Sequence, residues 1–332
     1  MKRLFLQTIV AAVALAAAGM APAQTRTIKF ANQNAKGHPI VLGMEKFAEL
    51  VDKKSAGRLK VQVFPGGVLG SDQANVSALQ GGTLEMASMN SGIFSSLVKD
   101  FAIYDFPFLF GNAREADAVV DGPFGQNLHK KLEDKGLVGL AYYELGFRQI
   151  TNSKRPIQKV EDIAGLKLRV IPSPINVDWV KALGANPTPL PFPEVYAALE
   201  QKAVDGQENP VATIKAAKLY EVQKYMTLTN HQYNPQSVVI SKKFWDQLPP
   251  ADQKILKEAA VESAQYERTQ SRAILQSGLE DLKKAGMEVN ELSAAEVTKL
   301  REKMKPVIDK NSASVGEGTV QAMMAELAKL RK

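Results

Sequence analysis

The sequence predicts an α/β protein with two domains. Short stretches of alternating apolar residues, such as Thr27–Ala31 and Leu59–Phe64, are each followed by a segment in which apolar residues have helical spacing. This order of strands and helices is typical of sheets covered by helices. The chain has 332 residues, of which about 309 follow a predicted leader, and this length suffices for two domains.

Residues 1–23 have the features of a secretory signal peptide. The basic pair Lys2-Arg3 precedes an apolar, alanine-rich core over 4–19, and Ala-Pro-Ala at 21–23 is a small-residue cleavage site. An uncleaved membrane anchor is the alternative, although the core is short for one. The sequence contains no cysteine, so we expect neither a lipid anchor nor disulfides. We therefore expect an exported, periplasmic protein.

Charge and motifs argue against nucleic-acid, metal and nucleotide binding. The formal net charge is +7, and removal of Lys2 and Arg3 leaves +5, with basic and acidic residues interspersed. The three histidines, at 38, 129 and 231, lack the spacing of metal ligands. No G-x-G-x-x-G or phosphate-binding loop pattern is present. We expect no nucleic acid, no metal and no cofactor.

Polar residues follow the first and third predicted strands at their carboxyl ends, the edge where open α/β sheets bind ligands. The loop between the strand 27–31 and a helix that begins near Pro39 carries Gln33, Asn34 and His38. Asn90 follows the buried strand 84–89, and Gln73 lies at the start of a helix over 71–80. We expect these side chains to face a ligand. Ordinary capping and turn chemistry is the alternative for each.

Two arginines lie in or beside short apolar stretches, where a charge is costly unless it meets an anion. Arg148 follows a predicted strand, and alternation in Leu166–Ile171 puts Arg169 on the opposite face from Leu168. Pro172 ends that strand, so Arg169 lies near its carboxyl end. A planar guanidinium there suits a carboxylate, held by two parallel hydrogen bonds. Pairing with a structural acid is the alternative.

The second half of the chain continues the α/β pattern. We expect crossovers between the domains at 144–146 and 228–231. The remaining expected elements are strands over 163–171 and 234–240, helices over 174–183, 194–202, 252–284, 293–311 and 315–330, a stiff extended segment over 186–193, and a turn over 205–210.

Four motifs within 65 residues resemble those of one protein family. They are G-F-R-Q-I-T-N at 146–152, G-L-K-L-R-V-I-P at 165–172, P-L-P-F-P-E-V-Y-A-A-L at 189–199 and V-D-G-Q-E-N-P at 204–210. In this order they resemble the extracytoplasmic solute receptors of TRAP transporters, of the DctP type. The additional Ile171 moves Pro172 one residue further from Arg169 than in the family pattern.

The resemblance implies a two-lobed periplasmic solute-binding protein fold, with crossover strands and a long helix at about 251–285 that spans both lobes. Lobe I would comprise 24–146 and 235–270, and lobe II 147–234 and 271–332. It also implies delivery of the ligand to a small and a large integral membrane subunit. We expect the receptor itself to be a monomer.

The resemblance implies a role for Asn209, and the sequence itself suggests roles for three further residues. Asn209 would donate a hydrogen bond to the carboxylate beside Arg169, while Glu208 is expected to be structural. Phe192, at a helix start, can lie on the apolar face of a sugar ring, with core packing as the alternative. Gln236 follows a crossover and can reach the ligand. Sialic-acid receptors of the family have Glu where this chain has Asn90, which argues against sialic acid.

Two classes of function remain to be compared. A binding protein would close two lobes around an organic anion, whereas an exported enzyme would need a nucleophile with a base, an acid pair or a metal cluster in the cleft. The sequence shows none of these catalytic patterns, so we expect no enzyme activity. The arginine anchor surrounded by amides favours a sugar acid, either a uronate or an aldonate. A C4-dicarboxylate is the alternative, with Arg148 or His38 facing its second carboxylate.

Overall fold

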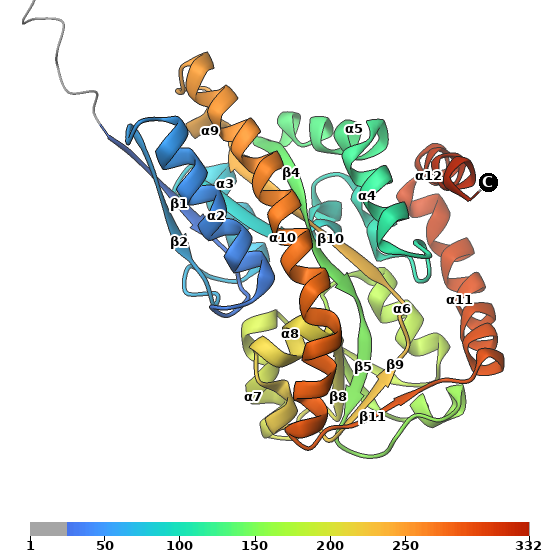
Figure 1. The fold of residues 1–332 in the computed structure, drawn as a ribbon. Helices are drawn as coiled ribbons and strands as arrows, with labels where there is room; N and C mark the ends of the chain where they lie inside the picture. Colours follow the sequence, from blue (N-terminus) through green and yellow to red (C-terminus); the bar gives the residue numbers. More distant parts are fainter. Residues whose placement is uncertain (1–24, 332) are drawn as a thin grey trace, which may run out of the picture.

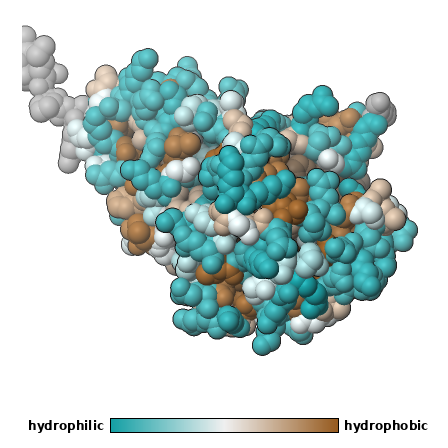
Figure 2. All heavy atoms as spheres, turned by 60° about the horizontal axis from the view of Figure 1, so that its bottom comes forward, coloured by the Kyte–Doolittle hydropathy of each residue, from teal (hydrophilic) through white to brown (hydrophobic). Residues whose placement is uncertain are grey.

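The computed structural model describes residues 25–331 and contains two mixed β-sheets, each with its own helices (Figure 1). The predicted signal peptide over 1–23 lies outside the described residues. Between 25 and 331, no helix combines the length and the apolar character needed to cross a membrane. In Figure 2 the visible face is mostly hydrophilic, with apolar residues in scattered groups.

Lobe I is built on a five-stranded sheet with the order β2-β1-β3-β10-β4. β10 runs antiparallel to β3 and β4, while β1 is parallel to β2 and β3. Its strands are β1 (Arg26–Ala31), β2 (Leu59–Phe64), β3 (Met86–Asn90), β4 (Leu137–Phe147) and β10 (Tyr233–Ser241). Its helices are α2 (Pro39–Lys54), α3 (Asp72–Gly81), α4 (Ala113–Asp121), α5 (Pro123–Lys131) and α9 (Lys242–Trp245), with short 3-10 helices η1 (Ser91–Ser96), η2 (Lys99–Asp105) and η3 (Glu133–Lys135).

Lobe II is built on a six-stranded sheet with the order β11-β9-β5-β8-β6-β7. Its strands are β5 (Gln149–Asn152), β6 (Lys167–Val170), β7 (Asn186–Pro189), β8 (Gly206–Asn209), β9 (Tyr225–Leu228) and β11 (Glu288–Glu291). Its helices are α6 (Pro174–Ala182), α7 (Val195–Glu200) and α8 (Val211–Ala216), with 3-10 helices η4 (Val160–Ile163), η5 (Phe192–Glu194) and η6 (Leu219–Glu221).

Two crossover segments and one long helix connect the lobes. β4 passes into β5 near Gly146, whose φ is +106°, and β9 passes into β10 near Asn230, whose φ is +43°. The helix α10 (Pro250–Lys284) has 35 residues and runs along both lobes (Figure 1), packing on α2 and β4 at one end and on α8 at the other. The two-lobed α/β fold is therefore the predicted one, including the position of the long helix.

The C-terminal helices α11 (Ala294–Val315) and α12 (Glu317–Leu330) form a further connection. α11 packs on α6 of lobe II and on η2 of lobe I, with the Arg301 guanidinium carbon 4.3 Å from the Phe108 ring centroid. α12 packs on α4, α5 and η2, all in lobe I. The structure therefore places α12 on lobe I, although the expected boundary put the whole of 271–332 in lobe II.

Two local predictions about lobe II need correction, and one of its edge strands was not predicted. The strand expected over 163–171 is limited to β6, because 160–163 forms a 3-10 helix and Gly165 turns the chain at φ +78°. The turn expected over 205–210 contains the buried strand β8, which pairs with β5 and β6. The strand β11 was not predicted at all. It pairs with β9 at the sheet edge, where only two of its four residues are half-buried.

Candidate ligand-binding site

A cavity of about 20 Å³ lies between the lobes, where the ends of several strands meet. β3 and β10 are paired with Asn90 opposite Gln236, so lobe I brings these two amides together. Lobe II contributes Arg169 from β6 and Asn209 from the end of β8. The full lining is Gln33, Asn34, Asn90, Leu145, Arg148, Arg169, Ile171, Phe192, Asn209 and Gln236.

Eight of the ten residues predicted for the site line this cavity, and two do not. His38 is buried but points to lobe II elsewhere, where its Nε2 lies 3.0 Å from the Thr213 Oγ1. Gln73 is exposed on α3 and does not line the cavity. The neighbouring Asp72 turns inward instead and is 3 % exposed, because consecutive residues on a helix point in different directions.

The Arg169 side chain is held in place by hydrogen bonds to the backbone, and no acidic side chain among the described residues forms an ion pair with it. Its Nε and Nη2 donate to the carbonyl oxygen of Leu190 at 2.9 and 2.6 Å, and its Nη1 is buried without a hydrogen-bond partner. The ring centroid of Phe192 is 5.9 Å from the guanidinium carbon. Burial lowers the pKa of Arg169 to about 9, with the neighbouring Arg148 adding to the effect. An anion bound here would offset both the cost of burying the Arg169 charge and its repulsion from Arg148.

Arg148, in contrast, already has an acid of its own. Its Nη2 donates to Glu208 Oε1 at 2.9 Å, and its Nε donates to the other carboxylate oxygen. His231 Nε2 lies 3.4 Å from the same carboxylate. Burial alone would raise the pKa of Glu208, but Arg148 and His231 outweigh it and lower this pKa to about 2. Glu208 is therefore a structural acid, as expected. Of the three Arg148 nitrogens, Nη1 alone lacks a hydrogen-bond partner among the described residues.

Hydrogen bonds within the protein determine what several of the amides can offer a ligand. Gln33 Nε2 donates to Asp72 Oδ2 at 2.8 Å, which leaves Gln33 Oε1 as a buried acceptor without a partner. Asn90 Oδ1 accepts from the Gly92 backbone N–H at 2.8 Å, which leaves its Nδ2 as an unpartnered donor. Gln236 Oε1 is also unpartnered. Asn209 Nδ2 donates to Gln207 Oε1 at 2.5 Å.

Asp72 is a residue of this region that the sequence analysis missed. Its Oδ1 is buried without a partner, and burial raises its pKa to about 7, although the Asn90 backbone N–H and Arg169 act in the opposite direction. In the sequence it reads as an ordinary first-turn acid of α3, after the capping residue Ser71. Only its place beside Gln33, 39 residues earlier, distinguishes it.

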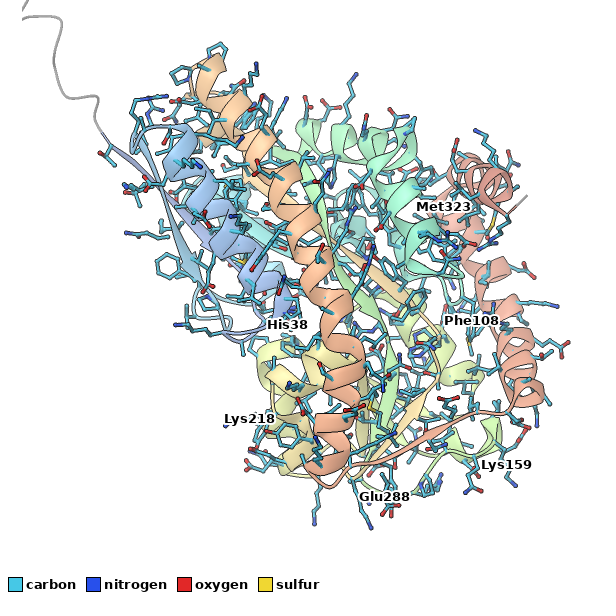
Figure 3. The ribbon with its side chains drawn as sticks, in the orientation of Figure 1. His38, Phe108, Lys159, Lys218, Glu288 and Met323 are labelled. Carbon is cyan, nitrogen blue, oxygen red and sulfur yellow. The ribbon has the colours of Figure 1, made fainter. Side chains whose placement is uncertain are left out.

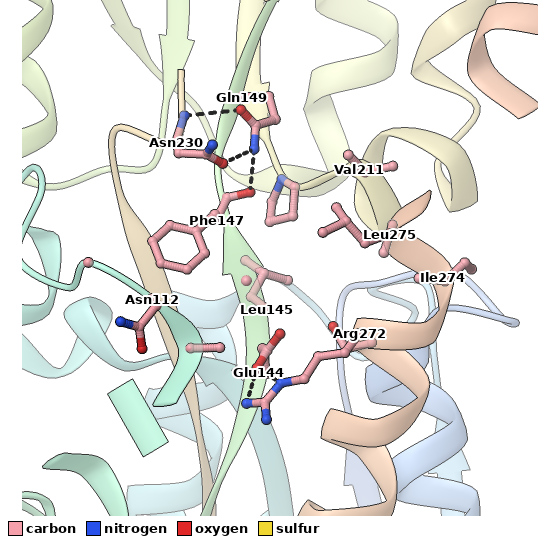
Figure 4. A pocket seen from close by; sticks show the side chains of 16 residues that line it. Asn112, Glu144, Leu145, Phe147, Gln149, Val211, Asn230, Arg272, Ile274 and Leu275 are labelled. Carbon is pink, nitrogen blue, oxygen red and sulfur yellow. Dashed lines mark hydrogen bonds and ion pairs between the residues drawn. The ribbon is translucent and has the colours of Figure 1, made fainter. Parts of the chain in front are cut away.

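A larger cavity of about 390 Å³ lies between the crossover segments and α10 (Figure 4). Leu145 lines both cavities. In the larger one, Gln149 Nε2 donates to Asn230 Oδ1 at 2.6 Å, and Arg272 pairs with Glu144 at 2.6 Å. None of the residues that line it has a buried side-chain nitrogen or oxygen without a partner, whereas five residues of the smaller cavity do. The buried polar atoms without a hydrogen-bond partner therefore distinguish the smaller cavity from the larger one.

Comparison with known proteins identifies the family. The family described as bacterial extracellular solute-binding protein, family 7 (DctP), matches residues 30–314. The chain belongs to this family. Among curated relatives, the Escherichia coli 2,3-diketo-L-gulonate-binding periplasmic protein YiaO is 38 % identical over 275 residues, covering 83 % of this chain and 84 % of the relative. The Rhodobacter capsulatus C4-dicarboxylate-binding periplasmic protein DctP is 36 % identical over 330 residues, covering 98 % and 99 %.

Solved structures of TRAP solute receptors share the fold. A TRAP periplasmic solute-binding protein from Ochrobactrum anthropi is 57 % identical, with a TM-score of 0.83 and coverage of 93 % and 96 %. The Advenella mimigardefordensis sugar acid binding protein in complex with galactonate is 42 % identical, with a TM-score of 0.91 and coverage of 92 % and 99 %. A receptor from Sulfurospirillum deleyianum with bound succinate is 32 % identical, with a TM-score of 0.87 and coverage of 91 % and 99 %. The chain is a TRAP solute receptor.

Proposed function

We propose that this receptor captures a hydroxylated monocarboxylic acid, of the aldonate or uronate class, and anchors its carboxylate on Arg169. The observation that carries the proposal is the set of unpartnered groups in the cavity. Arg169 Nη1 and Asn90 Nδ2 offer donors to a carboxylate or hydroxyl oxygen. Gln33 Oε1 and Gln236 Oε1 are acceptors, and only an O–H or N–H group of the ligand can satisfy them.

The acceptors distinguish sugar acids from dicarboxylates that have no hydroxyl group. Succinate is ionised at neutral pH and has no donor, so it would leave Gln33 Oε1 buried and unpaired. Leaving such a group unpaired costs about 1–3 kcal/mol. Asp72, next to Gln33, would also disfavour a second carboxylate. The galactonate-bound and succinate-bound structures show that the fold accommodates either class of acid in other family members, so the choice depends on such local groups.

Capture requires the lobes to move apart and then close. A volume of about 20 Å³ is little more than one water molecule needs, so a sugar acid can enter only when the lobes separate. Rotation about the two crossover segments is the natural motion. We further infer that the closed receptor acts in the periplasm and delivers its ligand to the small and large membrane subunits of a TRAP transporter. We propose that it acts without catalysis, as its relatives are named for the solutes that they bind.

Isothermal titration calorimetry with the purified mature protein tests the ligand class. Galactonate, galacturonate and D-erythronate are compared with succinate and malate at pH 7.5. We expect at least one sugar acid to bind at least about tenfold more tightly than succinate. The variant Gln33→Leu removes the acceptor, so it should weaken sugar-acid binding, whereas succinate binding should become tighter because no unpaired acceptor is then buried.

A C4-dicarboxylate is the competing candidate. Arg148 favours it, because this residue lines the cavity and its Nη1 has no hydrogen-bond partner among the described residues. A C4-dicarboxylate would use Arg169 and Arg148 for its two ends. Tighter binding of succinate or malate than of every sugar acid would establish this alternative and overturn the proposal.

A further inference from the structure

His38 and Thr213 form a direct side-chain hydrogen bond between the lobes. His38 is the residue before α2, which packs on α10 and β4 in lobe I, and Thr213 belongs to α8 of lobe II. The two side chains are 1 % exposed, and His38 Nε2 lies 3.0 Å from Thr213 Oγ1. Figure 3 shows His38 at the end of α2, where the two lobes approach one another.

The local structure determines which nitrogen of His38 carries the proton. Its Nδ1 accepts a hydrogen bond from the Ile40 backbone N–H at 3.1 Å and thereby caps α2. The neutral ring must then carry its proton on Nε2 and donate it to Thr213 Oγ1. Burial lowers the pKa of His38 to about 3, so the ring is neutral at physiological pH. Capping and the bond between the lobes therefore use the two nitrogens of one neutral ring.

This bond connects the two segments that carry ligand-site residues. His38 ends the loop that holds Gln33 and Asn34, and Thr213 lies in the first turn of α8, which follows Asn209 at the end of β8. When the lobes separate, Thr213 must leave the His38 ring, because the two residues move with different lobes. The hydrogen bond can therefore exist only in a closed form in which Gln33 and Asn34 face Asn209.

We propose that His38 is a positioning residue that, through Thr213, holds the receptor closed over its ligand. It touches no ligand atom itself. Its effect falls on the lifetime of the closed complex, since association begins in the open form, where the bond is absent. This inference rests on the proposed function for the choice of ligand, but the closure that it describes is a property of the protein.

Stopped-flow binding of galactonate tests the proposal. The variant Thr213→Val keeps the shape and removes the hydroxyl, so closing would bury an unpaired imidazole N–H. We expect the dissociation rate constant to rise about 5- to 20-fold with the association rate constant unchanged. Thr213→Ser should restore the wild-type rate. His38→Asn keeps a capping oxygen but cannot reach Thr213, so it should match Thr213→Val, and the double variant should be no worse than either.

A control variant and a measurement without ligand allow the role of the His38–Thr213 bond to be tested independently of the ligand class. Thr298→Val removes an exposed hydroxyl on α11, which bonds only to the Ala294 carbonyl, and should change nothing. Because the sequence has no cysteine, spin labels can be placed at Gln62→Cys in β2 and Glu200→Cys in α7. Pulsed electron spin resonance distances should show fewer closed molecules for Thr213→Val than for Thr213→Ser.

Two results would overturn the proposal: a dissociation rate within twofold of wild type in Thr213→Val, or equal closed populations in the two variants. If none of the three sugar acids binds, the proposed ligand class fails, whereas the distance measurement still decides whether the bond favours closure.

Discussion

The two buried arginines beside the smaller cavity differ in whether the protein itself supplies an acidic partner. Arg148 is 0 % exposed and meets the carboxylate of Glu208 within the protein. Arg169 is 2 % exposed, and among the described residues its hydrogen bonds go to one backbone carbonyl, so under the proposal its charge is available to an anion from outside. A buried cation with its own acid belongs to the fold. One without an acid is costly until a ligand arrives, and this cost favours binding.

The largest expected effect on stability is from the variant Glu208→Gln. It keeps the volume of the side chain but leaves the Arg148 charge buried and unpaired. We expect the free energy of unfolding to fall by about 3–5 kcal/mol, measured by urea denaturation. As a control, Asp246→Asn breaks the exposed pair with Lys242 at 2.8 Å and should cost less than about 1 kcal/mol. If both variants lost the same small amount, Arg148 would not depend on its acid.

The pH dependence of stability gives a second test of the Arg148–Glu208 pair. The pKa of Glu208 is lowered from 4.5 to about 2, so the folded state binds its proton less readily than the unfolded state. The stabilisation is therefore fully present above pH 4.5 and is lost as the pH falls toward 2, by about 1.4 kcal/mol per pH unit. The stability difference between wild type and Glu208→Gln should narrow over this range in urea titrations. A difference independent of pH would contradict the assignment.

The smallest expected effect concerns the ring beside Arg169. Phe192→Leu keeps an apolar side chain but removes the cation–π contact. We expect the affinity for the ligand to fall by about 0.5–1 kcal/mol, or roughly two- to fivefold, in calorimetric titrations. Unchanged affinity would show that Phe192 serves packing alone. A loss of affinity above about 50-fold would be larger than the cation–π contact with Arg169 can explain, and would show that the Phe192 ring itself contacts the ligand extensively.

The position of Arg169 could be predicted from the sequence, whereas the partner of Arg148 could not. Alternation in 166–171 and the prolines that follow it are local signals, and they place Arg169 near the end of a strand. Glu208 is 60 residues from Arg148 and reaches it only because β8 pairs with β5. A turn was expected over 205–210 because this segment is polar. Its residues 206–209 nevertheless form the strand β8, which is buried on both sides.

The directions in which Asp72 and His38 point could not be predicted from the sequence for a similar reason. Asp72 and Gln73 are neighbours at the start of α3, and the direction in which α3 packs decides which of them faces inward. His38 was expected on the ligand because its loop is near the site, but its ring is turned to α8 by the cap that it gives to α2. Packing directions and contacts between lobes depend on the whole fold and leave no local pattern.

One measurement tests the central claim most directly: the affinity of the variant Arg169→Met for the ligand that wild type binds, measured by calorimetry beside its free energy of unfolding. Methionine removes the charge and keeps an unbranched side chain. If Arg169 is the carboxylate anchor, the affinity falls by about 2–5 kcal/mol, or roughly 30- to 5000-fold, while the fold is nearly as stable as wild type. Arg169→Lys should also bind weakly, because the forked geometry is lost. Binding of Arg169→Met within threefold of wild type would contradict the claim.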